Sequence, residues 1–478
     1  MPSIKVKKGG VYTDPVGIFA KKAGVYSAVA GVSAKVGGAY VSVTGPVQLA
    51  APIGYDWTPP VIIYKNGLVY TTSYVKTDFM PATTATLYVG PMGTTGIPGS
   101  DATGEGTPEK PYRSIKKGIT AAAALPDAGV RIVIDGSLGG VNNIYNRNLH
   151  WNGTLCDKNL VIVAVGGDIV SSTRYEAQTW VAHTTPGVWK TTRSAVVQVR
   201  DETSQVELTS PTGVKGYEAI FYRKPATQAE MESTPATWFT IGSDQYVHTH
   251  DGRMPDASLL LLAGVNNCVF SVNKRWYIEG VTFEGGVGDA VGSISAGIGA
   301  AGSVILERCN IRYAQGNAIA ATGIPLVIQH LGERKGCLLD ISNYHLGGNG
   351  YDCNALEIDV VSFDSGDTDG VNNDNITTGH ENTRLISIGC KGWGSVGPIG
   401  AHINTTQAWL LGCELGGSRS TAPGTASGAA VLAGNTAKVW AEDCRFDGVI
   451  ALVTTETAQI RTKNCTINGT VSGDVATY

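Results

Sequence analysis

Six segments in the second half of the chain share one pattern of apolar and polar positions. Each is centred on a small apolar anchor, with an apolar residue usually two positions after it and usually three and five positions before it. The anchors are Val281, Cys309, Cys390, Cys413, Cys444 and Cys465. Apolar residues at every second position are typical of β-strands. We therefore predict a strand before each anchor and another strand after it.

The alternation changes phase immediately before each anchor, which predicts a one-residue bend there. The bend residues are Gly280, Arg308, Gly389, Gly412, Asp443 and Asn464. All but Arg308 belong to the types that adopt a left-handed backbone at low cost. The last four anchors follow one another at 21 to 31 residues, which suits a coil of fixed cross-section with loops of varying length.

The pattern therefore predicts an all-β fold, a parallel β-helix in which equivalent positions stack. Two further units, at 338–348 and 355–366, fit less well because Ile341 or Val360 would occupy the bend. The cysteine anchors are expected to form an interior ladder rather than a zinc or redox site, since the nine cysteines include no Cys-x-x-Cys. A Cys390–Cys413 or Cys444–Cys465 disulfide is geometrically conceivable between neighbouring coils, about 4.8 Å apart, but is not expected.

The N-terminal region repeats a different motif. The segments "KKGGVY" at 7–12, "KKAGVY" at 21–26 and "KVGGAY" at 35–40 recur every 14 residues, and "KNGLVY" follows at 65–70. Gly-Gly or Asn-Gly between strand-forming residues predicts β-hairpins. We therefore expect hairpin repeats at 1–45 and a connecting β segment at 46–86. The six lysines of residues 1–40 are interpreted as a solvated hairpin face rather than a nucleic-acid site.

Residues 87–136 predict a strand, a Gly-rich loop, a short helix at about 114–125 and a buried strand, "VRIVIDG". The β-helix would then occupy 137–478. A long excursion at about 171–260 breaks the rhythm of the coils, and its Tyr, Trp, His and Arg side chains make it a second candidate surface for carbohydrate.

The entry segment resembles the first coil of right-handed parallel β-helices of the pectate-lyase type, in which a helix caps the open end. The residues that carry this resemblance are Tyr88, Val89, Asp101, Gly106, Pro111, Ser114, Ile115 and Ala121. The Lys-x-Gly-x-Val-Tyr repeat resembles docking repeats near the ends of bacteriophage tail proteins. Together they resemble a bacteriophage tailspike or tail fibre.

The tailspike resemblance implies a homotrimer that is made in the host bacterial cytoplasm and located in the tail of the virion. It also implies attachment to tail or baseplate proteins through residues 1–45, and binding or degradation of host surface polysaccharide along the β-helix. Neither a nucleic-acid partner nor membrane insertion is expected. No apolar stretch approaches about 18 residues, and the N-terminus lacks the apolar core of a signal peptide.

Composition agrees with a strand-rich fold. The 478 residues include 62 glycines, charged residues make up only 16% of them, and the net charge is −4. Many glycines indicate many backbone reversals, and few charges indicate few solvated helices.

The most polar stretch, 362–384, holds the candidate chemistry. As a glycosidase, acid and base would come from Asp364, Asp367, Asp369, His380 and Glu381. As a Ca²⁺ loop, oxygen ligands would come from Asp367, Asp369 and Asp374, although the full EF-hand spacing is absent. The third interpretation is an ordinary Asp/Asn/Gly loop that satisfies its own backbone.

Aromatic side chains are candidates for stacking on sugars, namely Trp180, Trp189, Trp238 and Trp393. Trp276 fits an inward position, and Glu279, Glu284 and Asp289 are expected on a solvated face. Three functions follow: a receptor-binding spike, a polysaccharide depolymerase with hydrolase or lyase chemistry, and a purely structural virion component. The first is favoured at this point because no carboxylate pair stands out as a catalyst.

Overall fold

The structure, a computed structural model, describes residues 46–137, 156–175, 178–265, 267–270, 273–286, 289–293, 302–337, 344–347, 352–366, 376–420 and 428–478, with the backbone alone at 269–270 and 289–293. It also describes the backbones of eight short strands at 6–42, 144–145 and 151–152. The chain divides into two compact units, residues 1–51 with 60–73, and residues 52–59 with 74–478. Each is described by itself.

The smaller unit consists of antiparallel strands. Three two-stranded hairpins pair β1 (Val6–Lys8) with β2 (Val11–Thr13), β3 (Phe19–Lys22) with β4 (Val25–Ala28), and β5 (Ser33–Val36) with β6 (Ala39–Ser42). A three-stranded sheet follows, with β7 (Val47–Gln48), β8 (Ile63–Asn66) and β9 (Val69–Thr72). Gly67 adopts φ +64° in the turn between β8 and β9, a conformation that glycine enters without steric cost.

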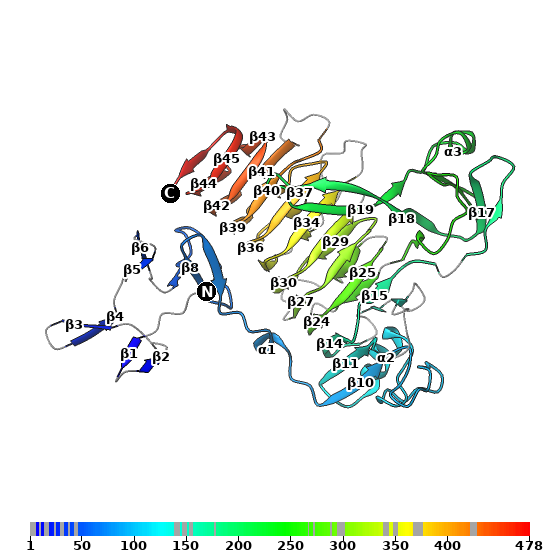
Figure 1. The fold of residues 1–478 in the computed structure, drawn as a ribbon, viewed down its shortest axis with the longest axis horizontal. Coiled ribbons are helices and arrows are strands. Elements are labelled where there is room, and N and C mark those ends of the chain that lie inside the picture. Colours follow the sequence, from blue (N-terminus) through cyan, green and yellow to red (C-terminus); the bar gives the residue numbers. More distant parts are fainter. Residues whose placement is uncertain are drawn as a thin grey trace. The chain divides into compact units, whose positions relative to one another are not determined.

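The larger unit is a parallel β-helix built from two long sheets (Figure 1). In the 12-stranded sheet the order is β10 (Ala85–Val89), β11 (Gly129–Asp135), β14 (Asn159–Val165), β24 (Arg275–Glu279), β27 (Ser303–Glu307), β30 (Leu326–His330), β33 (Asn354–Ile358), β36 (Arg384–Ile388), β39 (Gln407–Leu411), β42 (Lys438–Glu442), β44 (Gln459–Lys463) and β46 (Val475–Thr477).

The 18-stranded sheet takes strands from the remaining sides of each coil. It contains β12 (Ile144–Tyr145), β13 (Trp151–Asn152), β15 (Ile169–Ser172), β23 (Cys268–Phe270), β25 (Val281–Glu284), β26 (Asp289–Ser293), β28 (Asn310–Arg312), β29 (Asn317–Ala321), β31 (Glu333–Cys337), β32 (Tyr344–Leu346), β34 (Val361–Ser365), β35 (Thr377–Gly379), β37 (Lys391–Ser395), β38 (Gly400–His402), β40 (Glu414–Gly416), β41 (Ala429–Ala433), β43 (Arg445–Thr454) and β45 (Thr466–Ser472). Strands pair in parallel with their equivalents one coil away, which confirms the predicted fold class.

The one-residue bends are present where the sequence predicted them. Each adopts φ between +50° and +74°, at Gly280, Arg308, Gly389, Gly412, Asp443 and Asn464. In the unit at 355–366 the bend is Asp359, so the expectation that Val360 bends was wrong. A further bend lies at Leu331, in a coil that the sequence pattern did not indicate. Val360 is instead a buried anchor, 1% exposed. Ile341 lies outside the described residues.

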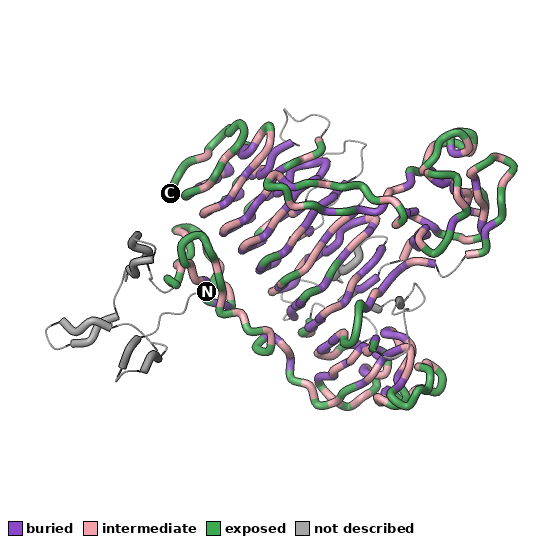
Figure 2. The backbone as a smooth tube through the Cα atoms, viewed as in Figure 1, coloured by how far each residue is buried: buried purple, intermediate pink, exposed green. Residues whose placement is uncertain are grey.

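The interior of the β-helix is apolar and continuous from the first coil to the last (Figure 2). The cysteine anchors belong to it as free thiols, and Trp276 is fully buried in it, as predicted. Burial raises the pKa of the Cys309 thiol to about 12. Because the thiolate is the reactive form, this cysteine is chemically inert at neutral pH.

A helix covers the open end of the first coil. Helix α2 (Ile115–Ala124) begins after Ser114, whose hydroxyl accepts a hydrogen bond from the Lys117 amide, and it buries Ile115 and Ile119 completely. Asp101 Oδ1 accepts from the backbone amide of Ser114 at 2.9 Å, which ties the Gly-rich loop to the helix start. Within the described residues, no helix is both long and apolar enough to span a membrane.

Two short segments before the first coil pack on the 12-stranded sheet. Tyr55 contacts the rings of Trp409 and Trp440, with ring centroids 6.0 and 5.9 Å away. Lys76 of the short helix α1 (Lys76–Phe79) pairs with Glu279 at 2.7 Å. Residues 52–59 therefore hold the late coils, and residues 74–79 hold the early ones.

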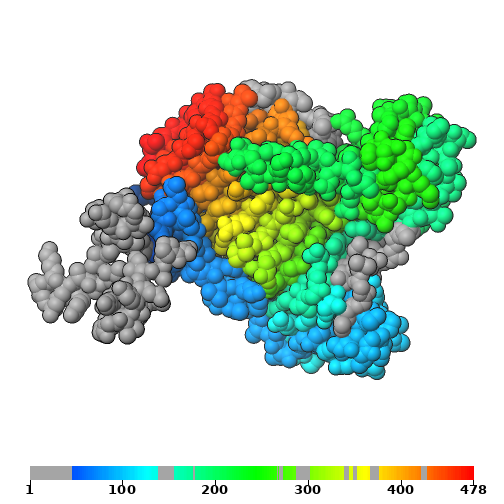
Figure 3. All heavy atoms as spheres, viewed as in Figure 1, coloured from blue at the N-terminus to red at the C-terminus, as the bar shows by residue number. Residues whose placement is uncertain are grey.

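The excursion leaves the β-helix after β15 and returns at β23. It contains an antiparallel sheet of β16 (Val181–Ala182), β17 (Val188–Thr192), β21 (Asp244–His248) and β20 (Thr237–Ile241), a sheet of β19 (Lys215–Tyr222), β18 (Val196–Thr209) and β22 (Leu259–Ala263), and helix α3 (Gln228–Ser233). The outer part of the β18–β19 hairpin, residues 205–218, is called the arm below. Figure 3 shows the arm in green lying across the coils.

Three hydrogen bonds fix the arm on three different coils. Lys335 Nζ on β31 donates to the Tyr217 carbonyl at 3.1 Å, and Trp393 Nε1 on β37 donates to the Leu208 carbonyl at 3.1 Å. Near the arm's tip, Ser210 Oγ donates to the Glu414 carboxylate at 2.9 Å. The arm therefore lies across several strands of the 18-stranded sheet and is held in a fixed position on them.

Candidate active site

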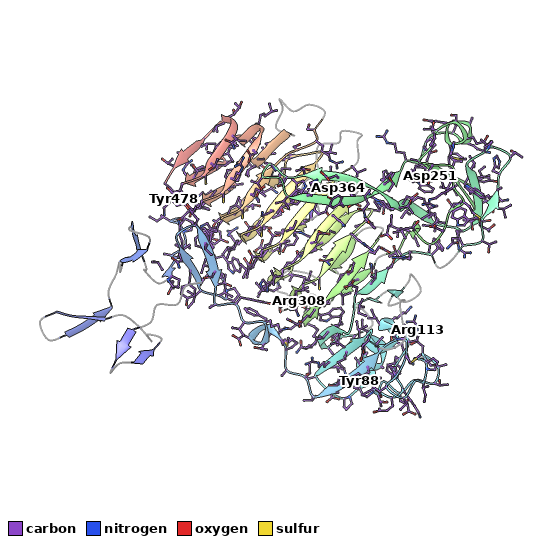
Figure 4. All side chains as sticks on the ribbon, in the orientation of Figure 1. Tyr88, Arg113, Asp251, Arg308, Asp364 and Tyr478 are labelled. Atoms are coloured by element: carbon purple, nitrogen blue, oxygen red, sulfur yellow. The ribbon has the colours of Figure 1, made fainter. Side chains whose placement is uncertain are left out.

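A cleft of about 610 Å³ lies between the β18–β19 hairpin and the coils beneath it. This volume is within the usual range for sites that bind small molecules or segments of a polymer. Strands β18 and β19 supply most of one wall, and the coils supply Gln315, Asp364, Gly366 and Arg419. Figure 4 shows Asp364 where the hairpin crosses the coils.

Glu218 on β19 is the acid on the hairpin side of the cleft. Residues alternate along this strand, so that exposed Lys215 and Tyr217 face outward while buried Gly216 and Glu218 face the coils. The Glu218 side chain is only 3% exposed, and its Oε2 has no hydrogen-bond partner among the described residues. Its Oε1 lies 3.4 Å from Arg200 Nη1.

Burial raises the pKa of Glu218 to about 8; Arg200 opposes this effect and the charge of Asp364 adds to it. A carboxyl group removed from water resists ionisation because the charged form loses its hydration. This shift favours the protonated form of Glu218, which is the form that can donate a proton in the cleft.

The β-helix makes room for Glu218 with a glycine. Gly336 on β31 adopts φ +69°, and a Cβ at this position would lie only 2.8 Å from Glu218 Oε1. The Gly336 carbonyl also accepts a hydrogen bond from Arg200 Nη2 at 2.9 Å. Gly336 thus sets how closely the arm and its acid approach the coils.

Asp364 on β34 is the acid on the coil side. It adopts φ +55°, in line with Gly336 on one neighbouring coil and Gly394 (φ +74°) on the other. Asp is one of the residue types that adopt a left-handed backbone at low cost, as Asp359 and Asp443 do at the bends. The Asp364 Oδ1 lies 2.6 Å from Arg419 Nη2, so the two side chains form an ion pair.

Arg419 is itself held in place by the backbone. Its Nε donates to the Gly394 carbonyl at 2.7 Å, and its Nη2 donates to the Gly366 carbonyl at 3.3 Å. Asp364 is therefore an oriented, ion-paired carboxylate that lines the same cleft as Glu218. An acid–base glycosidase requires two carboxyl groups in one cleft, one that donates a proton and one that is charged.

His380 and Glu381 lie at a different turn of the coil, between β35 and β36. The His380 ring packs 4.7 Å from that of His345, and burial lowers the pKa of His380 and lowers that of His345 to about 4. Glu381 adopts φ +50°, and its carbonyl accepts from the Thr405 hydroxyl. The structure does not include either residue in the wall of the cleft with Asp364.

The remaining candidates in this stretch, Asp367, Asp369 and Asp374, lie outside the described residues. Their catalytic and Ca²⁺-binding roles stay predictions. In the part of the chain that the structure describes, no three His, Cys, Asp or Glu side chains are grouped to hold a metal.

Of the four candidate tryptophans, Trp238 lines the cleft, although it is 2% exposed and lies beneath the Lys224 ammonium group, 4.8 Å from its ring. Trp180 and Trp189 pack in the apolar core of the excursion. Trp393 stacks on Phe363 under the arm, with ring centroids 5.0 Å apart. Glycan contacts of these side chains stay predictions.

The expectation that Glu279 and Glu284 lie on a solvated face was wrong. Both are buried, at 5% and 0% exposed. Burial by itself would raise the pKa of Glu284, but Arg174 and Arg312 hold it below its ordinary value, at 2.8 and 2.7 Å. This network fixes the root of the excursion to the β-helix. The side chain of Asp289 lies outside the described residues.

Sequence reasoning missed Glu218. The available signal was an acid on the inward face of an alternating strand, next to Gly216. This pattern indicates a functional residue only once the structure shows that the arm lies over Asp364.

Comparison with known proteins gives no match to any family model and no match among curated proteins. Solved structures similar to this chain include a glycoside hydrolase, with 9% identity, a TM-score of 0.49, and coverage of 82% of this chain and 96% of that one. The complex of XylC with xylose has 12% identity, a TM-score of 0.37, and coverage of 80% and 69%. The tailspike protein gp49 of Pseudomonas phage LKA1 has 10% identity, a TM-score of 0.18, and coverage of 76% and 71%. At this level of similarity none of them assigns a role to a residue of this chain.

Proposed function

We propose that this chain is a tailspike-type protein of a bacteriophage that hydrolyses host surface polysaccharide in the cleft beneath the β18–β19 hairpin. The observation that carries the proposal is that one cleft is lined by Glu218, whose pKa is raised by burial, and by Asp364, which is ion-paired with Arg419. Hydrolysis of a glycosidic bond needs one carboxyl group that donates a proton and one that is charged.

Glu218 has the environment of the general acid. It would transfer its proton to the oxygen of the leaving sugar as the glycosidic bond breaks. Arg200, 3.4 Å away, would then stabilise the carboxylate that forms. The charged Asp364, oriented by Arg419, would act on the opposite side, either as the base for an attacking water or as the nucleophile.

The tail location is a further part of the proposal. It is supported by the three N-terminal hairpins and by the resemblance of their repeated motif to phage docking repeats. Residues 1–45 would bind tail or baseplate proteins, and three chains would assemble into the spike.

A receptor-binding spike without hydrolase activity is the second candidate. It is favoured by the pairing of Glu218 with Arg200, because a guanidinium beside a carboxylate stabilises the charged form, which cannot donate a proton. In that case the cleft would hold the polysaccharide intact.

Incubation with capsule, lipopolysaccharide and exopolysaccharide from candidate hosts tests the proposal, with release of reducing ends as the readout. Wild type should release them, and Glu218→Gln and Asp364→Asn should not. The matched control is Glu207→Gln, since Glu207 is an exposed arm carboxylate paired with Lys215. Absorbance of unsaturated uronates would instead indicate elimination and overturn hydrolysis. Binding without products would establish the receptor-binding spike.

A further inference from the structure

The cleft is positively charged although the whole chain is not. Its lining contains four cations, Arg200, Arg223, Lys224 and Arg419, against two acids, Glu218 and Asp364. The net charge of the chain is −4.

Two of these cations serve the carboxyl groups and the fold. Arg200 is 2% exposed and donates to the backbone carbonyls of Ala219 and Gly336. Arg419 is paired with Asp364. They form the floor of the cleft.

The other two cations, Arg223 and Lys224, are exposed and follow directly after β19 at the cleft wall. The Lys224 ammonium group lies over the face of Trp238, which keeps it at the wall rather than extended into solvent. Among the described residues no ion pair joins Lys224 to a carboxylate, so its charge is available to a ligand. A guanidinium and an ammonium group at one cleft can each pair with a carboxylate group of a polymer chain.

We infer that the polysaccharide is acidic, and that sugars bearing carboxylates, such as uronic acids, bind at Arg223 and Lys224 while the scissile bond lies between Glu218 and Asp364. This inference rests on the proposed function for the position of the scissile bond. A neutral polymer would bring no ionic partner for the Lys224 ammonium group. An acidic one gains charge-assisted hydrogen bonds at the wall and a field that attracts it toward the cleft.

The test is the binding of a panel of purified bacterial surface polysaccharides, acidic and neutral, to wild type and to Glu218→Gln. Each acidic polymer is also supplied in a carboxyl-reduced form, which keeps the backbone and removes the charge. The polymers that bind should be acidic, and carboxyl reduction should weaken binding about tenfold or more. Added NaCl should weaken binding of the acidic form alone.

Charge variants locate the effect. Arg223→Gln and Lys224→Gln should each lower affinity for the acidic polymer severalfold, and leave affinity for its carboxyl-reduced form unchanged. Lys215→Gln is the matched control, because Lys215 lies on the outward face of the same hairpin and pairs with Glu207. Equal losses in all three variants would overturn the placement at the cleft wall.

The outcomes separate this inference from the proposed function. Selective binding of acidic polymers without release of reducing ends would remove hydrolysis and leave the substrate class standing. Cleavage of neutral polymers as fast as acidic ones, or no loss on carboxyl reduction, would overturn the substrate class and leave hydrolysis standing. A panel in which no acidic polymer binds would also overturn it.

Discussion

Replacing Gly336 with alanine should displace the catalytic acid, Glu218, without changing its chemical group. The new Cβ would lie 2.8 Å from Glu218 Oε1 and 3.0 Å from Tyr313 Cδ1. Ordinary contacts between such atoms are longer by about 0.5 Å, so the Glu218 carboxyl group must move away by roughly that distance. No atom of the catalytic groups is removed.

Two effects of different size are expected. An alanine at φ +69° strains the backbone by about 1–2 kcal/mol, which should lower the free energy of unfolding. Since a 1 Å displacement of a catalytic group costs about 100-fold in rate, a displacement of about 0.5 Å should lower kcat about tenfold.

Gly280→Ala is the matched control. Gly280 is a bend on another coil at φ +74° and does not line the cleft, and its nearest contacts would be ordinary ones, at 3.4 Å to Ala164 Cβ and 3.6 Å to the Ala164 carbonyl oxygen. Both variants should show a similar fall in Tm by calorimetry, and Gly336→Ala alone should lose kcat for release of reducing ends. If the two folded variants have equal kcat, Gly336 does not position Glu218 and the reasoning is refuted.

Three further predictions follow from the ionisation and packing of the described residues. Hydrolysis should decline as pH rises through about 8, the pKa of Glu218, because the proton donor is lost, and Glu218→Gln should lower kcat about 10²- to 10⁴-fold in a pH–rate profile. Burial lowers the pKa of His402 from 6.5 to about 4, so the free energy of unfolding should fall as pH falls from 6.5 to 4, because the unfolded chain takes up the proton first. In denaturant titrations, His402→Leu should remove about 3 kcal/mol of that pH dependence, and an unchanged dependence of the free energy of unfolding on pH would contradict this. Tyr55→Ala should lower the free energy of unfolding by about 3–5 kcal/mol, since its ring is buried against Trp409 and Trp440, and a loss below 1 kcal/mol would show that residues 52–59 do not hold the late coils.

The fold could be predicted in detail because every coil of a β-helix imposes the same structural requirements on the sequence. A bend that needs a left-handed residue selected Gly, Asp or Asn often enough to show the rung positions in the sequence. The coil that begins after Leu331 was missed because its anchor, Gly332, is not apolar. A Cβ at position 332 would lie 2.4 Å from the Cys309 carbonyl oxygen, so the close packing leaves no room for the usual apolar side chain.

Only one of the two acids of the site could be predicted from the sequence. Asp364 stands in a short polar stretch of one coil, where local composition marks it. Glu218 is distant in sequence, and it joins Asp364 only because the arm crosses the coils through contacts such as that of Trp393 with Leu208. Contacts of this kind between distant segments leave no periodic signal in the sequence.

The crystal structure of Glu218→Gln with an oligosaccharide cut from the polymer that it binds is the most direct test of the account. The predicted result is a sugar chain in the cleft, with a glycosidic oxygen within hydrogen-bonding distance of the replaced side chain and Asp364 on the other side of that bond. A sugar chain bound at the turn of His380 and Glu381, or on any surface that excludes Glu218, would contradict it.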